Sequence, residues 1–134
     1  MTQRQHRGKR KDNGEWVYGY LIGSDVIVGN IIEWDSEYFN TEFWTKVDSA
    51  TVGQRLERKD INDKPIFEGD RLHIEIKHYA TGKLIESGES VVEYRYDAYG
   101  VLWGYKNEFT PLDRFVYTTF EVVGNKYEED GHEQ

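Results

Sequence analysis

Histidine and cysteine, the side chains that most often bind transition metals, are few and poorly placed in this chain. There is no cysteine, which excludes disulfides, thiolate zinc sites and a cysteine nucleophile. His73 and His78 are five residues apart on a predicted strand, so their side chains are expected on opposite faces. The other two histidines, His6 and His132, lie near the chain ends, and a zinc site needs three or four convergent ligands. The sequence therefore predicts no metal site and no cofactor.

Catalytic serine and carboxylate motifs are equally unsupported. No serine lies in a Gly-x-Ser-x-Gly elbow, and no glycine-rich loop precedes a helix that could bind phosphate. Two pairs of neighbouring acids, Asp60 with Asp63 and Glu68 with Asp70, could bind a divalent cation or act as acid and base, but neither has calcium-loop spacing. We interpret them as solvated turn residues and expect no catalytic residue. A hydrolase that combines Asp and His from distant strands is the alternative that motifs would not reveal.

Aromatic side chains offer a functional interpretation. Five of them crowd one polar-flanked segment, and not all can face inward: they are Trp34, Tyr38, Phe39, Phe43 and Trp44. Exposed rings of this kind serve subunit interfaces, sugar platforms or base stacking. Core packing is the simpler alternative for the same residues.

Charge is distributed unevenly along the chain. Residues 1–11 contain five basic residues and no acid, whereas the remainder contains 12 basic and 25 acidic residues. An acidic body repels polyphosphate, which argues against binding of duplex nucleic acid. We expect residues 1–11 to be a solvated or self-docked basic arm, with phosphate contact as the alternative. The candidate interaction surface combines Arg7, Lys9 and Arg10 of this arm with the five crowded aromatics.

The elements that position these residues are predicted to be strands. Aromatics make up 15% of the chain and favour pleated surfaces, and no apolar helical rhythm persists for ten residues. Strands are expected at residues 16–22, 26–32, 43–47, 52–56, 71–77, 91–96, 101–105 and 115–123, with turns at 48–49 and 97–100 and one helical turn at 110–114. We therefore predict a mostly β fold, a partly open barrel or sandwich of short antiparallel strands.

The chain shows no targeting segment. The basic residues 1–11 are not followed by an apolar run, as a secretory signal requires. No stretch approaches the roughly 20 apolar residues that span a bilayer. Together with the missing cysteines, this predicts a cytoplasmic protein that does not contact membranes.

Three motifs in register connect the chain to a known family. They are residues 7–10 (RGKR) followed by 14–19 (GEWVYG), residues 51–54 (TVGQ) followed by Asp60 and 66–70 (IFEGD), and residues 121–128 (EVVGNKYE). With this order and spacing the chain resembles the YopX family of phage and prophage proteins over nearly its whole length. One departure is residues 61–64 (INDK), where the family often has an Asn-Gly or Asp-Gly turn.

The resemblance implies an all-β protein of unknown function and transfers no catalytic residue. Gly69 is explained by a tight turn and Asp70 by a side-chain bond to nearby backbone. This turn, opening a Leu/Ile strand, is similar to those of small SH3-like barrels, so we expect an SH3-like C-terminal portion. We expect one YopX-like domain over residues 1–134: the basic arm at 1–11, an N-terminal hairpin lobe at 12–58, a β-barrel-like lobe at 59–127 and an acidic tail at 128–134.

Three hypotheses on function remain at this point. The first is a non-enzymatic module that acts by protein–protein contact with a phage or host protein, or as a homo-oligomer, because its charges are self-complementary. The second is a binder of single-stranded nucleic acid through the basic arm and the aromatics. The third is the unrecognised hydrolase.

Overall fold

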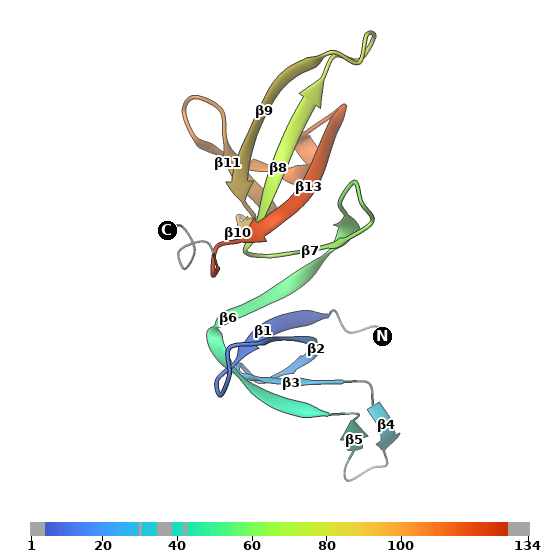
Figure 1. Cartoon of the computed structure of the whole chain (residues 1–134), viewed down its shortest axis with the longest axis vertical. Helices are drawn as coiled ribbons and strands as arrows, with labels where there is room; N and C mark the ends of the chain where they lie inside the picture. The colour runs from blue at the N-terminus through green and yellow to red at the C-terminus, as the bar shows by residue number, and fades with distance from the viewer. Residues whose placement is uncertain (1–4, 30, 35–38, 42, 129–134) are drawn as a thin grey trace. The chain divides into compact units, whose positions relative to one another are not determined.

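The computed structural model describes residues 5–29, 31–34, 39–41 and 43–128 (Figure 1). These residues form antiparallel strands and one short 3-10 helix, with no α-helix among them, so the prediction of a mostly β fold of antiparallel strands is confirmed. None of the helical structure in the described part of the chain is long and apolar enough to cross a membrane. In chain order the elements are β1 (His6–Arg10), β2 (Trp16–Ile22), β3 (Val26–Val28), β4 (Ile31–Trp34), β5 (Phe39–Thr41), β6 (Trp44–Lys59), β7 (Pro65–Phe67), β8 (Asp70–Lys77), β9 (Leu84–Val91), β10 (Glu93–Arg95), β11 (Ala98–Trp103), β12 (Glu108–Pro111), η1 (Leu112–Arg114) and β13 (Thr118–Asn125).

The chain divides into two compact units. Unit 1 is Met1–Arg55 and unit 2 is Leu56–Gln134, so the boundary falls within β6. In unit 1 the strands pair in the order β1-β2-β3-β6, and β6 also pairs with β1, which closes a ring of pairings. The β4–β5 hairpin is a separate two-stranded sheet.

The basic N-terminal segment is part of this ring. Residues 6–10 form β1, which pairs with β2 on one side and with β6 on the other. The arm at 1–11 was expected to be solvated or docked on its own chain; residues 6–10 are docked, as a strand of the sheet, and are not a solvated arm. Their sequence, four polar or charged residues and one glycine, did not indicate a strand, because the pairing that forms it comes from residues up to 48 positions away.

Strand β6 corrects a second expectation. The sequence predicted strands at 43–47 and 52–56 with a turn at 48–49, but β6 is continuous over 16 residues. The pairing with β1 shifts register between Lys9, opposite Asp48, and Arg7, opposite Gly53. The intervening residues form an enlarged bulge, in which Thr51 Oγ1 accepts from the Lys9 N–H (2.8 Å) and donates to the Asp48 carbonyl (2.7 Å). The polar residues thus bend the strand without ending it.

Gly19 allows the strands of unit 1 to approach closely. A Cβ at this position would collide with the backbone carbonyl of Val28 on the neighbouring strand. Such a Cβ would also meet the side chain of Ile27, which is fully buried. The strand predicted at 26–32 is interrupted after Val28, where the Gly29 N–H donates to the Phe43 carbonyl (3.0 Å).

Unit 2 contains two three-stranded sheets, ordered β13-β8-β9 and β10-β11-β12. Leu72 and Ile74 of β8, the strand expected at 71–77, are fully buried. The core cluster of unit 2 consists of Leu56, Ile66, Leu72, Ile74, Val92, Val101, Leu112 and Phe120. Trp103 and Phe115 pack against this cluster with their rings edge-to-face (80° between planes). The likeness of this unit to SH3-like barrels stays a prediction.

Turns in unit 2 follow local chemistry. Gly69 has a φ of +94°, and the Asp70 carboxylate accepts from the Phe67 N–H (2.8 Å), which closes the turn between β7 and β8. The β10–β11 turn, predicted at 97–100, lies instead at Tyr96 and Asp97, both with positive φ. A two-residue hairpin turn of this kind requires positive φ at both positions, and residue types other than Asn-Gly conceal it in the sequence. Of the helical turn predicted at 110–114, residues 112–114 form η1, whereas residues 110 and 111 belong to β12.

Candidate functional site

One face of the ring in unit 1 collects aromatic and cationic side chains. Residues directly opposite on paired strands share a face, and Lys9 lies opposite Trp16 while Arg7 lies opposite Tyr18. Every second residue of a strand faces the same way, so Tyr20 joins this set. We call it the aromatic face.

Strand β6 extends the aromatic face across the sheet. Tyr20 lies opposite Val28, and Val28 lies opposite Trp44. Two residues further along β6, Lys46 lies opposite Val26. The aromatic face therefore reaches over four strands and consists of Arg7, Lys9, Trp16, Tyr18, Tyr20, Ile22, Val26, Val28, Trp44 and Lys46.

The opposite face of the same strands points inward. It contains Gly8 and Gly19, and a Cβ at Gly8 would meet the Val47 side chain at 2.8 Å. Ile27 and Val47, which have no exposed surface, complete this inner face. The aromatic face is the outer one: Tyr18, Ile22 and Trp44 are exposed on it, whereas Arg7 and Val28 are buried among its larger side chains.

Two cations on the aromatic face surround one indole ring. The guanidinium carbon of Arg7 lies 4.5 Å from the Trp16 ring centroid, and Lys9 Nζ lies 5.5 Å from it. Both distances are within the range of attractive cation–π contacts. Arg7 is only 4% exposed, so its side chain supports Trp16, whereas Lys9 is half-buried and reaches the surface.

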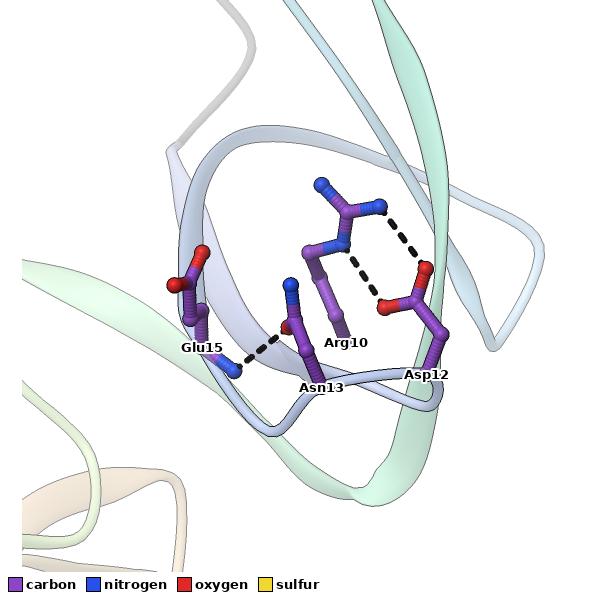
Figure 2. A network of polar contacts seen from close by, with 4 residues as sticks. All are labelled: Arg10, Asp12, Asn13 and Glu15. Atoms are coloured by element: carbon purple, nitrogen blue, oxygen red, sulfur yellow. Dashed lines mark hydrogen bonds and ion pairs between the residues drawn. The ribbon is translucent and has the colours of Figure 1, made fainter.

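Arg10 is held elsewhere. Its Nε donates to Asp12 Oδ1 (3.0 Å) and its Nη2 to Asp12 Oδ2 (2.8 Å), while the Glu15 N–H donates to Asn13 Oδ1 (2.9 Å) within the same turn (Figure 2). Side-chain hydrogen bonds and opposite charge raise the pKa of Arg10 and lower the pKa of Asp12. This exposed turn fastens the β1–β2 hairpin, and Arg10 is not brought to the aromatic face.

Of the five crowded aromatics, Trp44 joins the aromatic face and is 67% exposed. Phe43 precedes it and is also exposed. The backbones of Trp34 and Phe39 pair across the β4–β5 hairpin, but their side chains and all of Tyr38 lie outside the described residues. Sequence reasoning omitted Trp16, Tyr18, Tyr20 and Lys46 from the candidate surface, although the period-two spacing of the aromatics in residues 16–20 was visible.

The acids considered for metal binding or catalysis hold turns together. Asp60 is buried, its Oδ1 accepts from the N–H groups of Asn62 (2.9 Å) and Lys64 (2.8 Å), and its Oδ2 accepts from that of Val122 (2.9 Å). Burial alone would raise the pKa of Asp60, but these three donors and the Lys64 charge outweigh it and hold the pKa below the ordinary value. Asp63 is exposed beside Lys59 (3.8 Å).

The remaining titratable residues are dispersed. His73 Nε2 lies 3.1 Å from Glu75 Oε2 on the outer side of β8, and His78 Nδ1 accepts from the Ala80 N–H (3.1 Å) in the β8–β9 turn. In the part of the chain that the structure describes, no three His, Asp or Glu side chains gather closely enough to hold a metal ion.

Fold and surface together define an all-β protein of antiparallel sheets with an aromatic, cationic outer face on its first unit. The chain belongs to the YopX family, because the family model described as YopX protein matches residues 5–131. The resemblance found in the three motifs is thus confirmed. No curated protein and no solved structure is significantly similar to the chain.

Proposed function

We propose that this protein is a non-enzymatic module that acts by protein–protein contact through the aromatic face of unit 1. The observation that supports this is the shared outer face of Tyr18, Tyr20 and Trp44 with the cations Lys9 and Lys46. Tyr, Trp and Arg are the residues most enriched among interface hot spots. Rings anchored on a rigid sheet lose little conformational entropy on binding.

The charge of the face indicates an acidic partner surface. Residues 1–55 carry seven Lys or Arg and eight Asp or Glu, whereas residues 56–134 carry ten and seventeen. Unit 1 is therefore nearly neutral, and three of its cations, Arg7, Lys9 and Lys46, lie on the aromatic face. Family membership suggests a phage-type protein, so the partner is sought among phage and host proteins.

The test is an affinity capture from phage-infected bacterial extract with the full chain as bait. Trp44→Ser combined with Tyr18→Ser removes two exposed rings and is expected to abolish retention of the specific partner. The control is Tyr105→Ser, which removes a ring that is almost fully exposed outside the aromatic face. A partner retained equally by all three baits, or no partner at all, would refute the proposal.

Single-stranded nucleic acid is the second candidate, because rings and cations on one face are also how such strands are bound. Binding of a labelled oligonucleotide at about 50 mM salt would then weaken several-fold in Lys9→Ala and Lys46→Ala, and would fall as salt rises. The control is Lys106→Ala, an exposed lysine in the turn after β11. Indifference of the wild-type chain to oligonucleotides at this salt concentration ends this candidate.

A further inference from the structure

A second exposed apolar cluster lies at one end of the β13-β8-β9 sheet in unit 2. Five large apolar or aromatic side chains there are each more than half exposed: Tyr79, Leu84, Ile85, Val116 and Tyr117. They come from the β8–β9 turn, the start of β9 and the residues before β13. We call this cluster the tip.

Backbone contacts bring the three segments of the tip together. The Lys77 N–H donates to the Tyr117 carbonyl (2.9 Å), and Lys77 lies opposite Leu84. The rings of Tyr79 and Tyr117 have centroids 6.1 Å apart. Tyr117 also has a φ of +53°, an unfavourable conformation for an aromatic residue. The tip is thus a built surface, and its side chains are held by the sheet.

The tip includes the exposed start of β9, which is an edge strand of its sheet; we call these residues the open part of β9. Along β9 the register with β8 shifts, so that Ile76 lies opposite Glu86 and Lys77 opposite Leu84. Ile85 is the extra residue and projects outward, 60% exposed. Edge strands with exposed apolar side chains are sites of association unless something covers them. The other end of β9 approaches β11, where Ser90 Oγ donates to the Leu102 carbonyl (2.9 Å).

The sequence of this open part is complementary to itself. Residues 83–86 read Lys-Leu-Ile-Glu, with a positive end, two apolar residues and a negative end. When two copies lie antiparallel about a two-fold axis between Leu84 and Ile85, Lys83 faces Glu86 of the other copy and Leu84 faces Ile85 of the other copy. Two ion pairs and two apolar pairs form at once. Among the described residues neither Lys83 nor Glu86 makes an ion pair, and both are exposed.

We propose that the tip is the contact surface between two copies of this chain, related by a two-fold axis, with residues 83–86 of the copies antiparallel. Tyr79, Val116 and Tyr117 flank this contact. Five side chains of this size offer roughly 500 Å² per copy, or about 1,000 Å² in total, at the lower limit of specific interfaces. The dimer is therefore weak, with a Kd on the order of 10 µM. This contact is separate from the aromatic face.

Charge reversal tests the proposal without depending on the loss of apolar packing. Sedimentation equilibrium of the full chain is expected to show a monomer–dimer equilibrium. Lys83→Glu alone places two like-charge pairs in the dimer, as does Glu86→Lys, and each is expected to weaken dimerisation about tenfold or more. Because the two variants are complementary to each other, their equimolar mixture is expected to form a heterodimer about as stable as the wild-type dimer. The doubly reversed chain, Lys83→Glu with Glu86→Lys, is expected to dimerise like wild type.

Two control variants outside the tip are expected to leave the dimer intact. Lys106→Glu makes the same charge change as Lys83→Glu, and Trp44→Ser removes a ring from the aromatic face. Ile85→Lys, by contrast, places a charge in the centre of the contact and is expected to give a monomer.

The proposal is overturned if the wild-type chain remains monomeric up to about 300 µM, where such a dimer would be mostly formed. It is equally overturned if the two single variants fail to associate when mixed, or if Ile85→Lys dimerises like wild type. A monomer that instead binds vesicles through the tip would assign the surface to a membrane and also overturn it.

Discussion

The two edge strands of the β13-β8-β9 sheet differ: a loop is hydrogen-bonded to β13, whereas the start of β9 is exposed. Along β13, the Ile61 N–H donates to the Phe120 carbonyl (2.8 Å), and the Asp60 carboxylate accepts from the Val122 N–H (2.9 Å). The loop that follows β6 therefore caps this edge with both backbone and side-chain bonds. Along β9, the first half of the strand presents Leu84 and Ile85 to solvent.

This difference shows what it takes to close a sheet edge. Capping β13 requires a buried carboxylate, and that carboxylate is stable only because three N–H donors converge on it. On β9, no loop among the described residues covers Leu84 and Ile85, which are both more than half exposed. Exposed edges are usually blunted because they invite association, so an open apolar edge beside a capped one is a reason to expect a partner there.

The largest effect is expected from removing the cap. Asp60→Ala leaves the N–H groups of Asn62, Lys64 and Val122 without their acceptor. A buried unsatisfied donor costs about 1–3 kcal/mol, and this cost applies chiefly to Val122, which is half-buried, because water can reach the exposed Asn62 and Lys64. We expect the free energy of unfolding, measured by urea denaturation, to fall by about 2 kcal/mol. Asp60→Asn keeps one acceptor oxygen and should lose less. Wild-type stability in the alanine variant would show that the loop holds the edge without its carboxylate.

Low pH should reduce the stability that Asp60 contributes by capping β13. The folded-state pKa of Asp60 lies below its unfolded value, so its contribution to stability is complete above the unfolded pKa of about 4. The contribution is lost as the pH falls from there through the folded pKa. We expect the stability difference between wild type and Asp60→Asn, from urea titrations at several pH values, to shrink below about pH 4. A difference that grows in acid would contradict the assigned shift.

A substitution at the exposed start of β9 should leave the stability of the monomer nearly unchanged. Ile85→Thr removes apolar surface that is already exposed, so the monomer's free energy of unfolding is expected to change by no more than about 0.5 kcal/mol. The matched change Ile74→Thr, in the fully buried middle strand, should be strongly destabilising. Hydrogen exchange sharpens the same contrast, because the Val122 and Ile61 amides should be better protected than outward-facing amides at the start of β9. Equal protection at both edges would remove the distinction.

The smallest effect is expected at Asp12, a control for Asp60. Asp12 also accepts two hydrogen bonds, but from Arg10 in an exposed turn, where water replaces lost partners easily. Asp12→Asn should leave the Tm of the chain unchanged in calorimetry, although the same substitution at Asp60 lowers it. A comparable loss of Tm at both positions would mean that the difference in burial between Asp12 and Asp60 does not determine how much each carboxylate stabilises the fold.

Short-range patterns in the sequence were a good guide wherever a strand has one buried face or a turn has a required residue. The strand expected at 71–77 is observed as β8, and Gly69 with Asp70 occupies the turn where such residues are favoured. The charges and rings that make up the aromatic face were only partly recognisable, because Lys9, Trp16 and Trp44 meet through pairings between strands distant in sequence.

The sequence by itself established that the chain forms short antiparallel strands, is rich in aromatic residues and free of cysteine, and contains three motifs of the YopX family. These follow from backbone geometry and side-chain shape, which act over a few residues. The burial of Arg7 in a strand and the hydrogen bond by which Asp60 covers the edge of β13 each depend on a partner far along the chain. The exposure of Ile85 instead accompanies a register shift within the β8–β9 hairpin. Register between distant strands is set by the packing of the whole sheet, and no local preference encodes it.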